Sequence, residues 1–274
     1  MADDTAVGGS VSKARSSPEF IIAGHSHIFA LGAARDYSGP ESLTPVEAGG
    51  KQGYFLMETW GQGRGQSYWD ALIKHSKGRA VVLVFQGNQH FSNFLFARQP
   101  LFDFVDPLDT DYAPAPGAVL VPRRLVKALP ALMPAGLKHV ISQMQARGCR
   151  RIIVTGTPPV RRDYPQLVDE VRKWADWRKI TEYIGVDIAT CDYTPPPIMK
   201  RLWGVVQELL ADVARETGTK FVPVPAEAME PQGYLSEKYC GPLLDFTHAN
   251  NEYGRLMLEH IVSAVIEDTD TLAT

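Results

Sequence analysis

Residues near the two ends of the chain could together form a serine-based catalytic site. Ser26 follows the largely apolar run 19–23, and Asp245 and His248 precede an amphipathic pattern near the end of the chain. A serine hydroxyl is a poor nucleophile at neutral pH until an imidazole removes its proton, and a third group must orient that imidazole. All three residue types occur where a fold could bring them together. Hydrolysis or acyl transfer at Ser26 is therefore the first hypothesis.

Apolar runs predict the elements that would hold this site. The strongest strand signal is the run 80–85, whose continuous apolar character is typical of a strand buried on both faces of a parallel sheet. Pro223 suits an edge position for the last strand. Strands are further predicted at 19–24, 54–57, 151–156 and 220–224, with a short one compatible with 44–47. Helices are predicted at 67–76, 123–147 (broken at Pro130 or Pro134), 166–183, 197–217 and 250–267.

The alternation of strands and helices predicts the fold class. It indicates an α/β protein, a three-layer α/β/α sandwich with a mainly parallel, flavodoxin-like sheet of about five strands. Residues 18–274 are predicted to form a single domain, and the small, polar segment 1–17 is predicted to be disordered. The Pro- and Asp-rich stretch at about 98–122 is predicted to be an insertion. Both a lid or substrate wall and a variable surface loop are compatible with it.

Polar, glycine-containing turns follow three of the predicted strands, at 24–27, 86–90 and 155–159. A further glycine-rich stretch, 60–66, opens the first predicted helix. In open parallel α/β sheets, ligands bind beyond the carboxyl ends of the strands. Glycines let backbone N–H groups approach a ligand closely, and a helix N-terminus favours negative charge. These turns are therefore the predicted walls of the site.

Three short segments of the chain resemble the SGNH (GDSL-type) serine hydrolase superfamily, which is named for Ser, Gly, Asn and His in four separate blocks. Residues 24–27 look like the first block, and Gly87 with Asn88 looks like the third. Asp245 and His248 match the D-x-x-H of the last block. The resemblance implies Ser26 as the nucleophile, His248 as the general base and Asp245 as the group that orients it.

The resemblance also implies an oxyanion hole for the tetrahedral intermediate. Its donors would be the backbone N–H of Ser26, the side-chain amide of Asn88 and the N–H of a second-block glycine. Gly61, Gly63 and Gly65 all lie in the expected stretch, and Gly63 is favoured. Water would resolve the acyl-enzyme in a hydrolase, whereas a sugar hydroxyl that binds better than water would make the protein an acyltransferase.

The chain departs from the family pattern at two positions. His25 stands where the first block usually has Asp, and Gln89 follows Asn88 where the third block usually has Asp or Glu. Both changes remove negative charge near the nucleophile. His25, Gln89 and the neighbouring His27 and His90 are candidates for lining the pocket, with a structural role as the alternative.

Other interpretations of the same residues stay open. Ser26 could be a turn residue, and Asp245 could cap the following helix. A metal-dependent hydrolase could use His25, His27, His90, Asp245 and His248 as ligands, although no established metal motif is present and no metal or cofactor is predicted. A degenerate member of the family could bind acylated glycans or a protein partner without catalysis.

Composition narrows the class of partner. The net charge of −3 gives no reason to expect nucleic acid, and the basic pairs at 123–124, 150–151 and 161–162 are predicted to be solvated. Cys149, Cys191 and Cys240 are widely spaced, which argues against a disulfide framework or a zinc site. No signal peptide or membrane span is predicted. We therefore expect a cytoplasmic protein. The resemblance implies a small-molecule or glycan substrate, a carbohydrate or lipid-type acyl ester.

Overall fold

The computed structural model describes residues 19–33, 44–48, 50–57, 65–84, 88–97, 99–107, 109, 112–167, 173, 185, 187, 190–241, 245 and 247–266. The segment 1–17, predicted to be disordered, lies outside these residues. So does most of the predicted helix 166–183, whose first residues belong to the 3-10 turn η3 (Tyr164–Leu167).

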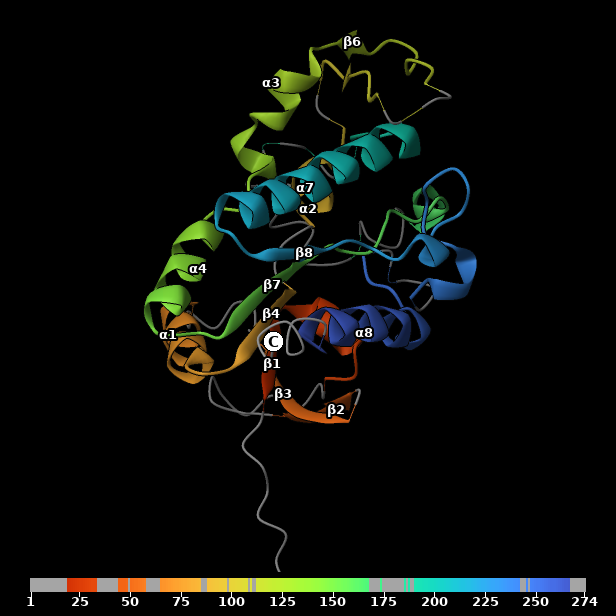
Figure 1. Cartoon of the computed structure of the whole chain (residues 1–274). Coiled ribbons are helices and arrows are strands. Elements are labelled where there is room, and N and C mark those ends of the chain that lie inside the picture. Colours follow the sequence, from red (N-terminus) through yellow and green to blue (C-terminus); the bar gives the residue numbers. More distant parts are fainter. Residues whose placement is uncertain are drawn as a thin grey trace, which may run out of the picture.

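A six-stranded sheet forms the centre of the molecule, in the order β2-β3-β1-β4-β7-β8 (Figure 1). Every neighbouring pair is parallel except β2 with β3. Without β2 the order is the flavodoxin-like 2-1-3-4-5, so the predicted fold class is confirmed. The sixth strand is the short segment around 44–47. The strands are β1 (Phe20–Gly24), β2 (Thr44–Ala48), β3 (Lys51–Met57), β4 (Ala80–Val84), β7 (Arg151–Thr155) and β8 (Lys220–Val222).

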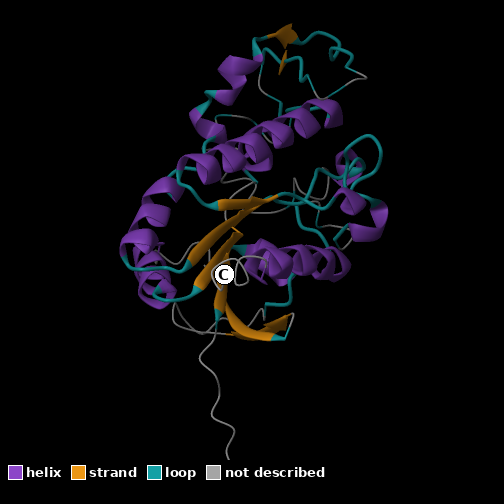
Figure 2. Cartoon of the chain, in the orientation of Figure 1, coloured by secondary structure: helices purple, strands orange, loops and turns teal. Residues whose placement is uncertain are grey.

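Helices cover both faces of this sheet (Figure 2). Along β1, Ile21 and Ala23 pack into one core cluster, whereas Phe20 and Ile22 pack into the other. The first cluster includes side chains of α1 (Gly65–Ser76), α4 (Leu137–Ala146) and α7 (Pro196–Glu216), and the second includes those of α8 (Asn251–Ile266). Burial on both faces explains why β1 and β4 are apolar throughout rather than alternating.

Prolines set the ends of several elements. The helical pattern 123–147 is broken into α3 (Arg123–Lys127), the 3-10 turn η2 (Pro130–Leu132) and α4, so both Pro130 and Pro134 fall between the two helices, as predicted. Strand β8 ends at Val222, before Pro223, and lies at the sheet edge. A proline lacks the N–H that would continue a helix or a ladder.

The described residues of the Pro- and Asp-rich segment 98–122, predicted to be an insertion, pack against α7. The segment contains a two-stranded parallel ribbon of β5 (Phe102–Asp103) and β6 (Val119–Leu120). The buried carboxylate of Asp103 accepts hydrogen bonds from the N–H groups of Phe104 and Ala115. It also pairs with Arg201 of α7 at 2.6 Å. This ion pair anchors the insertion to the sandwich.

Gly254 allows α8 to lie directly against the segment that follows Ser26. A Cβ atom at Gly254 would overlap the carbonyl oxygen and carbon of Ala30. We expect Gly254→Ala to lower the free energy of unfolding by about 3 kcal/mol or more, since backbone atoms cannot give way as a flexible side chain can. Urea unfolding of the purified variant measures this effect.

A second helical glycine provides the matched control. In α7, a Cβ at Gly204 would meet only an Asp106 carboxylate oxygen at 3.5 Å, an ordinary contact. Gly204→Ala should therefore stabilise the protein by about 0.5–1 kcal/mol, the usual gain of alanine over glycine inside a helix. Equal effects of the two substitutions would contradict the close approach of α8.

Candidate active site

Ser26 lies just beyond the carboxyl end of β1, a central strand of the sheet. It is the first residue of the 3-10 turn η1 (Ser26–Phe29), which the N–H of Ile28 closes by donating to the carbonyl of His25 at 3.0 Å. Gly24 lets the end of β1 lie close to the neighbouring β4, because a Cβ there would overlap the Val84 carbonyl oxygen. The hydroxyl of Ser26 therefore stands at the edge where α/β sheets bind ligands.

His248 reaches the same edge from the other end of the chain. It lies just before α8, whose N-terminus is capped by Asn250: the Asn250 Oδ1 accepts the N–H groups of Glu252 and Tyr253 at 2.9 and 3.1 Å. The carbonyl of His248 accepts the N–H of Gly241 at 3.2 Å. The backbone around the imidazole is thus held on both sides.

The structure brings the three predicted residues into one hydrogen-bonded chain. Ser26 Oγ lies 2.6 Å from His248 Nε2, and His248 Nδ1 lies 2.9 Å from both carboxylate oxygens of Asp245. Since Nδ1 faces a carboxylate, it carries the proton, which leaves Nε2 free to accept the serine hydroxyl. This is the relation of nucleophile, base and orienting group that serine catalysis requires.

Asp245 also organises its own turn. Its Oδ1 accepts the N–H groups of Thr247 and His248 at 3.2 and 3.1 Å, and the Thr247 hydroxyl at 3.1 Å. The alternative that Asp245 caps the following helix is wrong, because Asn250 caps α8 and the backbone N–H groups that Asp245 accepts belong to its own turn. Burial alone would raise the pKa of Asp245, but the hydrogen bond and charge of His248 and the Thr247 hydroxyl hold that pKa at about 2. The group facing His248 is a carboxylate at neutral pH.

The other two imidazoles near Ser26 are neutral at pH 7. The buried ring of His27 lies 4.8 Å from that of His248 between centroids, at an interplanar angle of 51°. Burial, and then the proximity of His248 and His25, hold the pKa of His27 well below its usual range. Burial lowers the pKa of His25 to about 4. His25 therefore adds no positive charge where the SGNH pattern usually has Asp.

Asn88 stands at the carboxyl end of β4, the strand next to β1, and precedes α2 (Gln89–Phe94). Its side chain makes no capping hydrogen bond to that helix. His90 is buried, with its ring 4.6 Å from that of Phe91 between centroids. The favoured oxyanion glycine, Gly63, and the alternative Gly61 lie outside the described residues, and Gly65 is the first residue of α1.

A cavity of about 580 Å³ opens beside Ser26 and His248. Its described lining combines the candidate site with the N-terminal end of α8: Ser26, Phe29, Ala30, Asp245, His248, Ala249, Asn250, Asn251, Glu252 and Arg255. His25, His27, His90 and Gln89, the candidates for lining the pocket, are not among these residues. Neither is any described residue of the insertion at 98–122.

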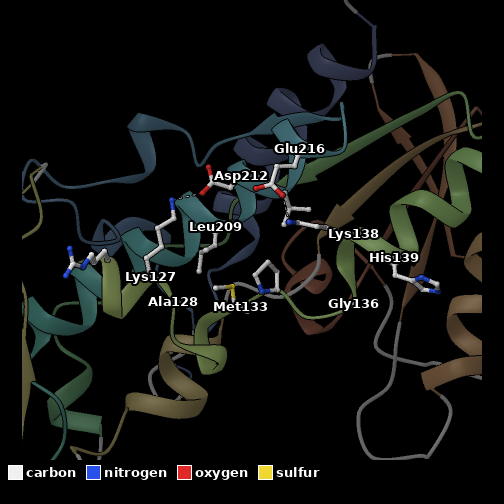
Figure 3. A pocket seen from close by; sticks show the side chains of 12 residues that line it. Lys127, Ala128, Met133, Gly136, Lys138, His139, Leu209, Asp212 and Glu216 are labelled. Atoms are coloured by element: carbon white, nitrogen blue, oxygen red, sulfur yellow. Dashed lines mark hydrogen bonds and ion pairs between the residues drawn. The ribbon is translucent and has the colours of Figure 1, made fainter. Parts of the chain in front are cut away.

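A larger cavity, of about 670 Å³, is lined by residues of α3, α4, α7 and the segment between α3 and α4 (Figure 3). Its lining includes Met133, Leu209 and the ion pair between Lys127 and Asp212 at 2.6 Å. Its described lining includes no serine, threonine or cysteine that could act as a nucleophile beside a base. The cavity beside Ser26 is therefore the candidate active site.

Arg161 corrects one prediction. The basic pair at 161–162 was predicted to be solvated, but the Arg161 side chain is buried, whereas Arg162 is exposed. Arg161 donates to the backbone carbonyls of Gly241 and Asp245, both at 3.2 Å. A carboxylate two residues on, at Asp163, is the one local signal that could have pointed to it, because a buried guanidinium needs an anionic partner.

Three further observations concern the described residues only. No three His, Cys, Asp or Glu side chains among them are placed to hold a metal ion. Cys149, Cys191 and Cys240 form no disulfide with one another. None of the helices described is both long and apolar enough to cross a membrane.

Comparisons with known proteins give low similarity. No family model matches the chain, and no curated protein matches it. An extracellular lipase from Streptomyces rimosus is 12% identical with a TM-score of 0.48, over 91% of this chain and all of that one (100%). A catalytic variant of an acetylxylan esterase from Geobacillus stearothermophilus is 11% identical with a TM-score of 0.44, over 91% and 94% of the two chains. TM-scores below 0.5 do not establish a shared family, so the functional assignment rests on the geometry of the site.

Proposed function

We propose that this chain is a serine hydrolase of the SGNH type that cleaves an ester through an acyl-enzyme on Ser26. One observation carries the proposal: the continuous chain of contacts from Ser26 Oγ to His248 Nε2, at 2.6 Å, and from His248 Nδ1 to Asp245, at 2.9 Å. The order of the residues along the chain, with Gly87 and Asn88 between them, supports the resemblance to that family.

Acylation begins when His248 takes the proton of the Ser26 hydroxyl as the oxygen attacks the ester carbonyl. The C=O π electrons move to the carbonyl oxygen, and a tetrahedral intermediate forms. As that intermediate collapses, the bond to the leaving oxygen breaks, and the imidazolium gives its proton to the departing alcohol. Water then attacks the acyl-enzyme with His248 again as the base, which releases the carboxylic acid and restores Ser26.

The charges around His248 favour this sequence. Asp245 is held as a carboxylate, which stabilises the imidazolium that forms during attack. His25 and His27 are uncharged at pH 7, so neither repels that imidazolium. The positive charge that develops on His248 during attack is thus balanced by the carboxylate of Asp245.

The oxyanion of the tetrahedral intermediate requires hydrogen-bond donors directed at it. We assign this role to the backbone N–H of Ser26, the amide of Asn88 and the N–H of Gly63. Asn88 is suited to it because it follows β4, the neighbour of β1 in the sheet, and its side chain makes no capping hydrogen bond to α2. Losing one such donor costs about 2.7–4 kcal/mol in the barrier.

For the substrate we propose a carbohydrate or lipid-type acyl ester. The described lining of the cavity beside Ser26 is polar at the α8 end, with Asn250, Asn251, Glu252 and Arg255, and apolar at Phe29 and Ala30. Both a polar and an apolar part of a substrate would find matching side chains there. The same parts would support an acyltransferase if a sugar hydroxyl replaced water in the second step.

Hydrolysis of p-nitrophenyl esters of increasing chain length, and of acetylated sugars, tests the proposal. We expect p-nitrophenyl acetate to turn over at pH 8, and EDTA to leave the rate unchanged. Loss of the rate on chelation would favour the metal-dependent alternative. Binding of acetylated oligosaccharides with no release of acetate would favour a non-catalytic glycan-binding protein.

A further inference from the structure

The buried guanidinium of Arg161 joins two parts of the chain that are far apart in sequence. Arg161 lies in the loop that follows β7, and its side chain is 6% exposed. Its Nη1 donates to the carbonyl oxygens of Gly241 and Asp245, both at 3.2 Å. These carbonyls belong to the loop that presents the carboxylate of Asp245 to His248.

Asp163 fixes the orientation of this guanidinium. Its two carboxylate oxygens accept the Nε and Nη2 protons of Arg161 at 3.0 and 2.8 Å, a bidentate pair. The hydrogen bond from Arg161 is the main reason why the pKa of Asp163 lies below its usual value. The Nε and Nη2 atoms of the Arg161 guanidinium are therefore held by Asp163, in the loop after β7. The third nitrogen, Nη1, is left to bind the carbonyls of Gly241 and Asp245.

The loop 241–248, which carries Asp245, has other backbone contacts only where it begins and ends, among the described residues. The N–H of Gly241 donates to the His248 carbonyl at 3.2 Å, and Cys240 forms a bridge with Ala249. These contacts close the base of the loop. Among the described residues, Arg161 is the side chain that holds the backbone of Asp245 itself.

We propose that Arg161 is a positioning residue for Asp245, and through it for His248, in the reaction proposed above, on which this inference rests. Arg161 is not among the described residues lining the cavity beside Ser26, so it has no contact with substrate to contribute. Its effect passes through one backbone carbonyl to a carboxylate, and from there to the imidazole. Catalytic groups tolerate displacements of only about 0.5 Å.

The test compares Arg161→Lys with Arg162→Lys, a matched control one residue away. Arg162 is exposed and pairs with Glu230 and Gln232 instead. A lysine cannot bind a carboxylate and two carbonyls with a rigid fork. We expect Arg161→Lys to lower kcat for p-nitrophenyl acetate roughly 10- to 100-fold with KM within about twofold, since the loss is in geometry rather than in binding. Arg162→Lys should leave both constants unchanged.

Chemical rescue separates positioning from a general loss of structure. In Arg161→Ala, millimolar methylguanidinium should restore part of kcat, whereas methylammonium at the same concentration should not. If Arg161→Ala does not fold, Asp163→Asn, which keeps the guanidinium but removes its bidentate anchor, should show the same selective fall in kcat. A wild-type kcat in folded Arg161→Lys, or equal rescue by both cations, would overturn the proposal.

Hydrogen exchange makes the outcome independent of the proposed activity. Arg161→Lys should accelerate amide exchange in the peptide that contains Gly241 and Asp245, and Arg162→Lys should not. If the wild-type protein hydrolyses no ester while this exchange difference is present, the proposed function fails and the anchor stands. Unchanged exchange in an active wild-type background would overturn the anchor alone.

Discussion

Replacing Ser26 with alanine should lower kcat for ester hydrolysis by about five to six orders of magnitude, the usual cost of removing a serine nucleophile from an intact site. The reason is that Ser26 Oγ is the atom that lies 2.6 Å from His248 Nε2, and no other hydroxyl lines the described part of the cavity. A residual rate above that of water is expected from the oxyanion donors and from binding. Steady-state hydrolysis of p-nitrophenyl acetate measures the loss.

Ser263→Ala is the control for this substitution. Ser263 lies on the exposed side of α8, where its hydroxyl donates to the Glu259 carbonyl at 3.0 Å. We expect it to leave kcat unchanged, and both variants to unfold within a few degrees of the wild type. A Ser26→Ala protein that retained the wild-type rate would show that another group attacks the ester.

Replacing Asp245 with asparagine should lower kcat by about 10⁴-fold. The asparagine amide can donate to His248 Nδ1, which would then lose its proton to Nε2. In that tautomer Nε2 can no longer accept the Ser26 proton, and the fixed negative charge is gone as well. Rapid-mixing kinetics at pH 8, with KM measured alongside, would detect a loss of this size.

Acid stability checks the same substitution without reference to activity. Because the pKa of Asp245 falls from 3.8 to about 2 on folding, this group stabilises the folded state above pH 3.8. That contribution is lost as the pH falls through about 2, where the folded carboxylate takes up its proton. Asp245→Asn should therefore unfold with a weaker pH dependence between these values, and an identical acid profile would contradict the observed partners of Asp245.

Most of the sheet could be predicted because strands buried on both faces leave a direct signal in sequence. The apolar run at 80–85 indicates burial on both faces, and the proline directly after the last strand indicates an edge position. The sequence signal for the short strand β2 is weaker, because five residues that are only partly buried offer little periodicity to detect. The position of Ser26 followed from the strand before it, since parallel strands end at one edge.

Long-range backbone contacts explain what the sequence did not show. Arg161 binds two backbone carbonyl oxygens about eighty residues away. Because every residue has a backbone carbonyl, such a partner cannot be recognised from the sequence. Gly254 is required by the path of the backbone at Ala30, which no local pattern reports. The low pKa values of His25 and His27 are caused first by burial, which residue type alone does not report.

Labelling with a fluorophosphonate, followed by mass spectrometry of the tryptic peptides, tests the central claim most directly. The reagent reacts with a serine only when a base activates its hydroxyl, so it reports the Ser26–His248 contact without any choice of substrate. Fragment ions must place the adduct, because the tryptic peptide 16–35 also contains Ser16 and Ser17. We expect one adduct per chain, on Ser26, that is absent from His248→Ala. An unlabelled Ser26 in folded wild-type protein, or a label that persists in His248→Ala, would contradict the account.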